Sequence, residues 1–402
     1  MKVRLKRALV FLVAVFFIGC DDTHDTHTSA TTGIPHIYIT TTNRAPIESN
    51  EVYTQALLTI DGDVEYDDYS GAAQIRLRGN TSMWAPKKPY RIKLEKGASI
   101  LGLAQNRDWV LLANWIDVTL LTNAVAMRVS QLLDMPFANH AIPVDVTMNG
   151  QYQGSYLLTE QIEVGKNRIH IADGGTLLEL DQYRSDEWQF NTTHFDLPVM
   201  VKYPKLTSTS ELDVIRDEFE VLTNAVASES FPANNYLDYI DEDALVNYLI
   251  VMLLTDNEEI NHPKSIFLYK PKNGKYTLGP PWDFDWGFGF EGYGIHNQFY
   301  DRPLFWQPLE STTGTNFFHR FLKDPKIKTK TIARWATFKR DKLPVLIQYV
   351  KDYSKTIEKS YQKDYQLWSS QQNDRSPNVD PLSMENWLKG RAEFLDSYLA
   401  NF

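Results

Sequence analysis

The sequence has almost no cysteine: Cys20 is the single one among 402 residues. One cysteine cannot form a disulfide within the chain, so the fold has to be held together by packing. Basic residues are also in the minority, 41 Lys and Arg against 51 Asp and Glu, and the net charge of -10 disfavours binding to a phosphate backbone. Nucleic acid is therefore not an expected partner. The chain is instead rich in aromatic residues, 13% of the total, whose rings can fill a large core.

Long apolar runs are scarce as well, and the clearest one, residues 8–18, follows a basic N-terminus. It is too short for a transmembrane helix, which needs about 20 apolar residues. Residues 1–19 therefore read as an export signal. Gly19-Cys20 at its end resembles a bacterial lipoprotein signal, which implies a lipid on Cys20, a membrane as partner, and a place on the periplasmic or extracellular face of the cell envelope. A plain secretory signal is the alternative.

The remaining chain divides into three parts by its hydrophobic pattern. Residues 20–34 are polar and threonine-rich, which is typical of a flexible tether. Residues 35–205 alternate with period two and predict strands, with one helix over 118–133. Residues 206–402 predict helices and a single hairpin. We expect an α+β protein made of two lobes of one catalytic unit, a β-rich N-lobe and a mainly helical C-lobe.

Acidic and amide side chains gather where a long apolar helix pattern ends. That pattern runs into Asp256, and Asn261 follows five residues later. The hairpin after it has Asn273-Gly274, a strong turn signal, and pairing around this turn places Lys264 opposite Asp283. The sequence therefore predicts that the loop at Asp256 and the segment at Asp283 converge.

Oxygen ligands without cysteine or clustered histidine suit a hard cation such as Mg²⁺, or Mn²⁺, bound together with substrate phosphates. In protein kinases a catalytic Asp accepts the proton of the attacking hydroxyl, an Asn five positions later binds metal, and a second Asp follows a short hairpin. Asp256 has the position of the catalytic Asp. Asn261, Asp283 and Asp285 have those of metal ligands. ATP is the expected nucleotide.

The phosphates of ATP also require a flexible loop followed by a lysine on a strand. Residues 78–82 form a turn-rich loop that contains Ser82, and Lys88 and Lys93 follow it. We expect Ser82, Lys88 and Lys93 to bind the nucleotide. The helix over 118–133 has no glutamate to pair with the lysine, so Glu160 or Glu163 is the expected substitute.

Several blocks of the sequence together resemble the CotH (spore coat protein H) kinase family, secreted proteins with an atypical protein-kinase-like fold. They lie in the same order along most of the chain: residues 78–82, 87–93, 121–123, 149–160, 178–181, 201–204, 256–261 and 281–285. The resemblance implies a two-lobed kinase-like fold and transfer of the ATP γ-phosphoryl to Ser or Thr of exported proteins. It also implies that Asp256 is the catalytic carboxylate, Asp283 the metal carboxylate and Lys93 the phosphate lysine.

Two other functions remain open from the residues. Asp283 and Asp285 form a D-x-D pair, which metal-dependent glycosyltransferases use to hold a sugar nucleotide. Alternatively, the aromatic side chains could serve a non-catalytic surface protein that binds carbohydrate or protein. The first alternative leaves Asp256 and Asn261 unexplained.

Overall fold

The computed structural model describes residues 32–402, except for 172–173, 293, 306–308, 310–311 and 373–374. The predicted signal, Cys20 and most of the predicted tether lie outside the described residues. Within the part predicted as the tether's end, Thr32 and Ile34 are buried, and the Thr32 hydroxyl donates to Asp145 Oδ2 at 2.7 Å. These residues therefore belong to the folded part of the chain.

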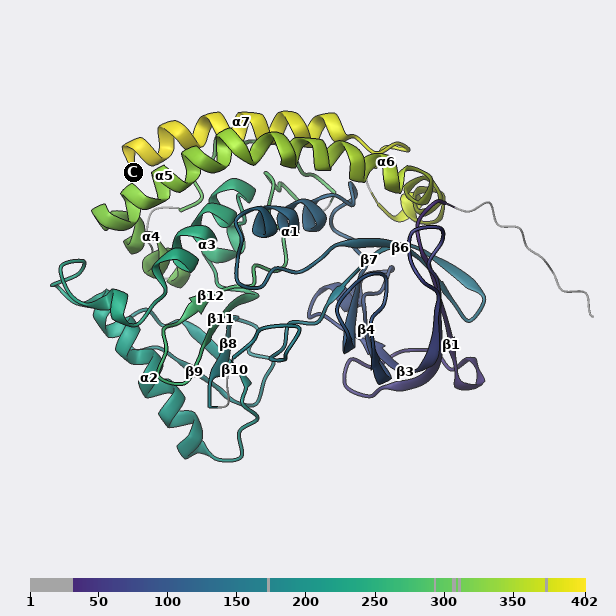
Figure 1. Ribbon diagram of the computed structural model, residues 1–402, viewed down its shortest axis with the longest axis horizontal. Coiled ribbons are helices and arrows are strands. Elements are labelled where there is room, and N and C mark those ends of the chain that lie inside the picture. Colours follow the sequence, from purple (N-terminus) through teal and green to yellow (C-terminus); the bar gives the residue numbers. More distant parts are fainter. Residues whose placement is uncertain (1–31, 172–173, 293, 306–308, 310–311, 373–374) are drawn as a thin grey trace, which may run out of the picture. The chain divides into compact units, whose positions relative to one another are not determined.

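Seven strands form a closed barrel (Figure 1). In spatial order they are β1 (His36–Thr41), β2 (Thr54–Asp61), β3 (Tyr69–Leu77), β4 (Tyr90–Ala98), β5 (Asn106–Leu112), β7 (Gln151–Glu160) and β6 (Ile142–Met148). All neighbours are antiparallel except β1 and β6, whose parallel pairing closes the barrel. Closure leaves no free edge in this sheet.

The barrel has its own hydrophobic core, which follows from the period-two pattern of its strands. In β2, for example, Ala56, Leu58 and Ile60 are buried and alternate with more exposed residues. They pack with the inward residues of the other strands, including Ile92 and Trp109. The inside of the barrel is therefore filled with side chains.

A second sheet takes its strands from both halves of the chain. Its order is β12 (Thr277–Leu278), β11 (Ile266–Lys270), β8 (Thr176–Leu180), β10 (Pro198–Tyr203) and β9 (Gln189–Asn191). The prediction of a β-rich N-lobe and a helical C-lobe, as in a two-lobed kinase-like fold, is therefore wrong. Periodicity identified most of the strands, but it carries no information on which strands become neighbours or whether a sheet closes.

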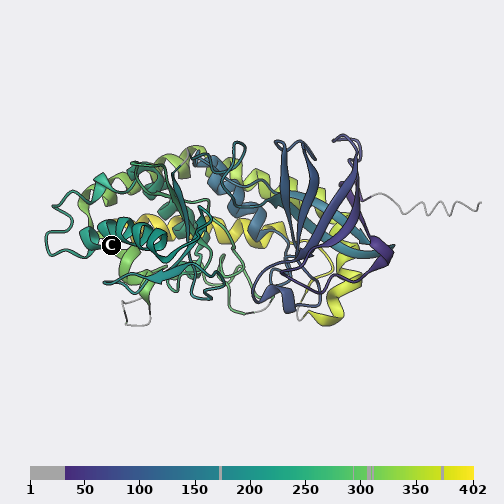
Figure 2. The same ribbon diagram turned by 90° about the horizontal axis from the view of Figure 1, so that it is seen from below.

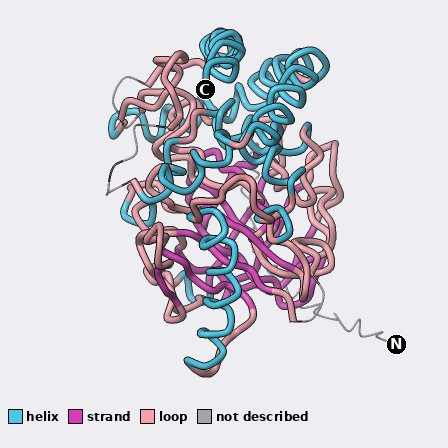
Figure 3. Tube along the Cα trace, turned by 90° about the vertical axis from the view of Figure 1, so that its left-hand side faces the viewer, coloured by secondary structure: helices cyan, strands magenta, loops and turns pink. Residues whose placement is uncertain are grey.

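The helices pack around these two sheets, and Figure 3 shows the strands running through the middle with helices above and below. They are α1 (Thr122–Leu132), α2 (Thr209–Ala227), α3 (Glu242–Thr255), α4 (Thr313–Lys323), α5 (Pro325–Asp341), α6 (Leu343–Trp368) and α7 (Pro381–Asn401). Helix α3 is apolar on all sides because it contacts α1, α5 and α7. Within the described ranges, no helix combines the length and apolar character needed to cross a membrane.

Helix α6 connects the helical part to the barrel. It packs against α1, α5 and α7 and, further along, against strand β7 (Figures 1 and 2). Its long amphipathic pattern explains this position, because residues such as Leu346, Val350 and Ile357 recur on one face. One helix thus packs in the helical core and also contacts the outside of the barrel.

The hairpin before Asp283 forms with a register one residue away from the prediction. Tyr269 pairs with Thr277 rather than Leu278, because the reversal centres on Asn273 instead of lying between Asn273 and Gly274. Within it, Gly274 N–H donates to the Pro271 carbonyl. Lys264 is therefore not directly opposite Asp283. It still lies close enough for its charge to lower the pKa of Asp283.

Candidate functional site

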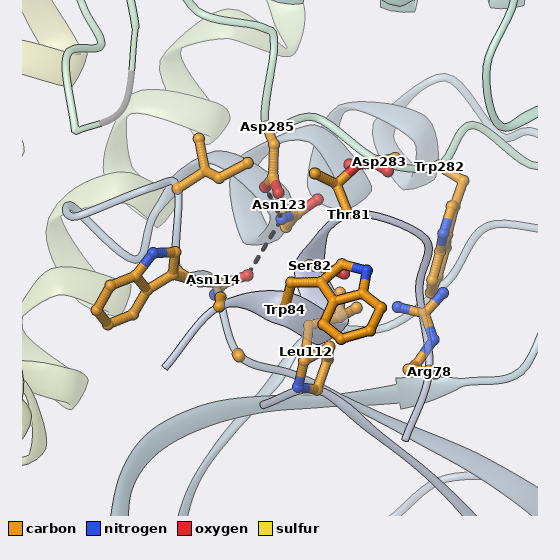
Figure 4. A pocket seen from close by; sticks show the side chains of 15 residues that line it. Arg78, Thr81, Ser82, Trp84, Leu112, Asn114, Asn123, Trp282, Asp283 and Asp285 are labelled. Atoms are coloured by element: carbon orange, nitrogen blue, oxygen red, sulfur yellow. Dashed lines mark hydrogen bonds between the residues drawn. The ribbon is translucent and has the colours of Figure 1, made fainter. Parts of the chain in front are cut away.

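A cavity of about 240 Å³ lies where the barrel, α1 and the segment after β12 meet (Figure 4). The loop after β3 and the end of β5 with the residues after it form most of its wall. Helix α1 contributes Asn123, and the segment after the hairpin contributes Trp282, Asp283 and Asp285. The cavity is thus assembled from segments separated by about half of the chain.

Asp283 and Asp285, two residues apart in the chain, both line this cavity. Burial raises the pKa of Asp285 well above its usual range, and the charges of Asp283 and Asp117 raise it further. Burial also raises the pKa of Asp283, against the lowering effects of Arg78, the Asp285 backbone N–H and Lys264. Two carboxylates that disfavour each other's ionisation form a site that a cation would stabilise.

The first turn of α1 fixes these carboxylates. The Asn123 side-chain amide donates to Asp285 Oδ1 at 3.2 Å and to Asn114 Oδ1 at 3.1 Å, while its oxygen accepts from the Phe284 backbone N–H at 3.2 Å. Figure 4 shows this chain of amides along one wall. From the other side, Asn257 Nδ2 donates to the Asp283 carbonyl at 2.8 Å. Residues of α1 and of the loop after α3 thus clamp the same short segment.

Arg78 supplies positive charge to the cavity. Its guanidinium lies 5.4 Å from the ring centroid of Trp282, as Figure 4 shows. Burial lowers the pKa of Arg78, whereas the charges of Asp283 and Glu179 act to raise it. Among the described residues that line the cavity it is the one with a cationic side chain.

The lysines predicted to bind phosphate lie elsewhere. Lys88 Nζ donates to the Met83 carbonyl at 2.9 Å, and Lys93 is half-buried on β4, where it pairs in register with Asp108. Neither side chain lines the cavity, whereas Ser82 does. Glu160, predicted to pair with the lysine, is buried against His140, with Oε1 2.6 Å from the ring Nδ1.

Asp256 and Asn261, predicted as catalytic and metal-binding, are both fully buried and do not line the cavity. Asp256 Oδ1 accepts from Arg391 Nη2 at 2.9 Å, and Arg302 lies 3.5 Å from its Oδ2. Asn261 donates to the Leu304 carbonyl at 2.8 Å and accepts from the Thr315 hydroxyl at 2.5 Å. In this structure both side chains serve contacts within the protein. The predicted convergence holds for the backbone, through Asn257 and Asp283.

Three indole rings form the apolar side of the cavity, those of Trp84, Trp115 and Trp282. Trp84 lies in a short 3-10 turn and is 76% exposed, an unusual degree for so large an apolar side chain. Trp115 is held from behind by Trp368, with the ring centroids 5.8 Å apart and the rings perpendicular. This wall suits a flat, aromatic ligand group.

Sequence reasoning did not select several of these cavity residues. Arg78 and Asn123 belong to blocks that resemble the CotH family, but composition gave no reason to prefer Arg78 over the lysines that follow it. Asn114 and Trp115 carry no sequence signal, since they are simply the residues after a buried strand. Only the folded chain brings them to Asp285.

A titratable pair next to the cavity gives a prediction for stability. Burial raises the pKa of Glu179 on β8 to about 7, despite Lys202 at 3.1 Å. Because the folded state then holds a proton that the unfolded state has lost, stability falls as the pH rises from about 4.5 to about 7. Between these pH values the free energy of unfolding of Glu179→Gln should therefore fall less than that of the wild type, by up to about 3 kcal/mol.

Urea unfolding of the wild type and of Glu179→Gln at pH 5, 6 and 7.5 measures the effect. Lys202 keeps its contact with Asp186 in the variant, so the substitution leaves no lone buried cation. A stability difference between the two proteins that stays constant over this pH range contradicts the expectation.

Comparison with known proteins completes the description of the site. A search of curated proteins found no match to this sequence. The family model described as CotH kinase protein matches residues 75–395, which include every residue that lines the cavity. The match covers most of the chain and confirms the resemblance found in the sequence. The chain therefore belongs to the CotH kinase family.

Proposed function

We propose that this protein transfers the γ-phosphoryl group of ATP to Ser or Thr residues of exported proteins. Family membership supports a kinase in general terms. The observation that carries the finer proposal is the composition of the cavity, with two carboxylates and an arginine at one end and three indole rings around it. The proposed place of action is the bacterial cell envelope, with the protein held at a membrane by a lipid on Cys20.

The charged and the aromatic side chains of the cavity suit the two parts of a nucleotide, its phosphates and its base. Phosphates require positive charge and hydrogen-bond donors, which Arg78 and Ser82 can provide. A nucleobase can stack on indole rings, and such stacking contributes about 1–3 kcal/mol per base in other proteins. The cavity volume of about 240 Å³ suits a ligand that is only partly enclosed.

The carboxylates present fit a divalent cation bound together with phosphates. No group of three or more His, Cys, Asp or Glu side chains able to hold a metal occurs among the described residues. Mg²⁺ does not require one, because it is commonly held by one or two carboxylates, waters and substrate phosphates. Asp283 and Asp285 would be its protein ligands. When bound, the ion would neutralise charge on the phosphate oxygens.

The residues of the cavity act mainly by position and charge. Phosphoryl transfer has a loose transition state, so catalysis depends largely on holding the phosphates and stabilising their charge. Arg78 can contact the transferred group, while Asn123 keeps Asp285 in place. Because both oxygens of Asp256 face arginines, the proposal assigns it a structural role rather than proton transfer.

Transfer of label from γ-labelled ATP, with Mg²⁺ or Mn²⁺, to a serine-rich acceptor protein tests the proposal. We expect Asp283→Asn to lower the rate by about 10²–10³-fold, because one of two metal carboxylates is lost. Asp217→Asn is the matched control, since Asp217 is exposed on α2 and, within the described part of the chain, forms its ion pair with the neighbouring Arg216.

Three results would contradict the proposal. Equal rates for Asp283→Asn and the wild type would remove the cavity from the reaction. Binding of a Mn²⁺–UDP-sugar without binding of MgATP, measured as a rise in melting temperature, would favour a glycosyltransferase, and binding of neither would favour a non-catalytic surface protein.

A further inference from the structure

A buried ion triad joins the cavity loop to helix α6. Lys87 lies in the loop that connects β3 to β4, and its Nζ is 2.6 Å from Asp364 Oδ1. Arg375 Nη1 is 2.8 Å from the other oxygen of Asp364. All three side chains are only 1% exposed. They connect a loop that lines the cavity to residues near the end of the chain.

The triad also contacts the backbone of the barrel. Asp364 Oδ1 accepts from the Ser155 N–H at 2.8 Å, and Lys87 Nζ donates to the Ser155 carbonyl at 2.5 Å. Gly154 permits this approach, because a Cβ atom there would lie 2.2 Å from Asp364 Oδ1. Strand β7, the cavity loop and α6 therefore meet at one point.

The same end of α6 supports the opposite wall of the cavity. Trp368 packs edge-on against Trp115, and its Nε1–H donates to the Gln153 carbonyl at 3.0 Å. Gln372, just after the helix, donates from Nε2 to the Trp115 carbonyl at 3.0 Å. Both walls of the cavity thus depend on Asp364, Trp368, Gln372 and Arg375, although none of these four residues lines it.

The charges of the triad suggest that it does more than stabilise the fold. One carboxylate faces two cations, so Asp364 would remain paired with Arg375 without Lys87. Burying an ammonium group has a cost in free energy that ion pairing often only offsets. A buried lysine bonded to both a strand and a helix is suited to fixing the loop that carries it.

We propose that Lys87 is a positioning residue that holds the loop over residues 78–89 against the end of α6 and so sets the distance between the two cavity walls. This role rests on the proposed function insofar as it concerns nucleotide affinity. The placement of the loop itself does not depend on any ligand, and the two can be measured separately.

Hydrogen exchange of the full chain tests the placement. In Lys87→Met we expect the amides of residues 79–86 and 113–116 to exchange at least about tenfold faster, while those of β2 and β11 keep their protection. Lys359→Met, at an exposed position on α6 about one turn before Asp364, should exchange like the wild type. Unchanged exchange at residues 79–86 in a folded Lys87→Met protein overturns the proposal.

Nucleotide affinity gives the second readout. If the loop loses its fixed position, MgATP should bind about tenfold more weakly and KM should rise more than kcat falls, because a preorganised site loses part of its binding energy. If Lys87→Met does not fold, Gln372→Ala replaces it, because Gln372 is half-buried and links the triad to the cavity wall. Its Nε2 donates to the Trp115 carbonyl at 3.0 Å, and its Oε1 accepts from Arg375 Nη1 at 2.7 Å. Gln372→Ala should speed up amide exchange at residues 113–116 and should weaken MgATP binding in the same way.

The outcomes separate this role from the proposed function. Faster exchange in a protein whose wild type binds no MgATP would support the positioning role and contradict the kinase proposal. Wild-type exchange at residues 79–86 in Lys87→Met, or at residues 113–116 in Gln372→Ala where Lys87→Met does not fold, would overturn the positioning role and leave the kinase proposal intact.

Discussion

Arg391→Met should lower the free energy of unfolding by about 3–5 kcal/mol, because it leaves a fully buried carboxylate without its main partner. Asp256 and Arg391 are both 0% exposed, and the guanidinium also donates to the carbonyls of Leu253 and Tyr300 at 2.8 and 3.0 Å. The remaining cation, Arg302, is 3.5 Å away and shared with Glu258. Urea unfolding followed by circular dichroism measures the loss.

Lys389→Met on the same helix is the control for this prediction. Its side chain is 55% exposed and pairs with Glu385 one turn away, so its loss should change stability by no more than about 0.5 kcal/mol. If Arg391→Met unfolds at the same urea concentration as the wild type, the pair is not structural. Asp256 would then be available for the catalytic role that the family resemblance implies.

Arg78→Met should reduce kcat/KM for phosphate transfer by about 10²–10³-fold, because it removes a fixed positive charge from the place where phosphate charge has to be stabilised. The folded state should persist, since Arg78 is only half-buried and its side chain makes no hydrogen bond to the other described residues. Its backbone bond to the Pro89 carbonyl is unaffected by the substitution. Steady-state kinetics over a range of MgATP concentrations measures the effect and separates kcat from KM.

Arg76→Met is the matched control for Arg78. Arg76 precedes it by two residues on β3, and its guanidinium lies over the ring of Tyr53, away from the cavity. The sequence alone predicts Lys93, rather than Arg78, as the residue that contacts phosphate. An active Arg78→Met together with an inactive Lys93→Met would return the phosphate contact to Lys93.

The sequence predicted elements well where one periodic pattern governs them. The strands of the barrel were expected from their alternation, and α1 was expected over 118–133 and is found at Thr122–Leu132. What could not be predicted was the closure of the barrel by β1 and β6, because their pairing is parallel and joins residues more than 100 positions apart. Hydrophobic alternation states which face is buried, not which strand lies next to it.

The candidate site could be predicted only in part, because a sequence motif does not state where its side chains point in the fold. Asp283, Asp285 and Ser82 do line one cavity, as the order of the motifs suggested. Asp256 and Asn261 have the spacing of kinase residues, yet their side chains turn into the interior toward Arg391 and Thr315. A spacing along the chain does not fix the direction of a side chain, and Arg391 lies 135 residues from Asp256.

The division of the cavity walls among distant segments has a consequence for synthesis and export. The walls come from residues 78–123 and 282–285, and residues up to Arg375 hold them in place. A ribosome-bound or partly threaded polypeptide therefore has no complete cavity until nearly all of it has emerged. If the chain is passed across the membrane before it folds, it stays inert in the ATP-rich compartment where it is made.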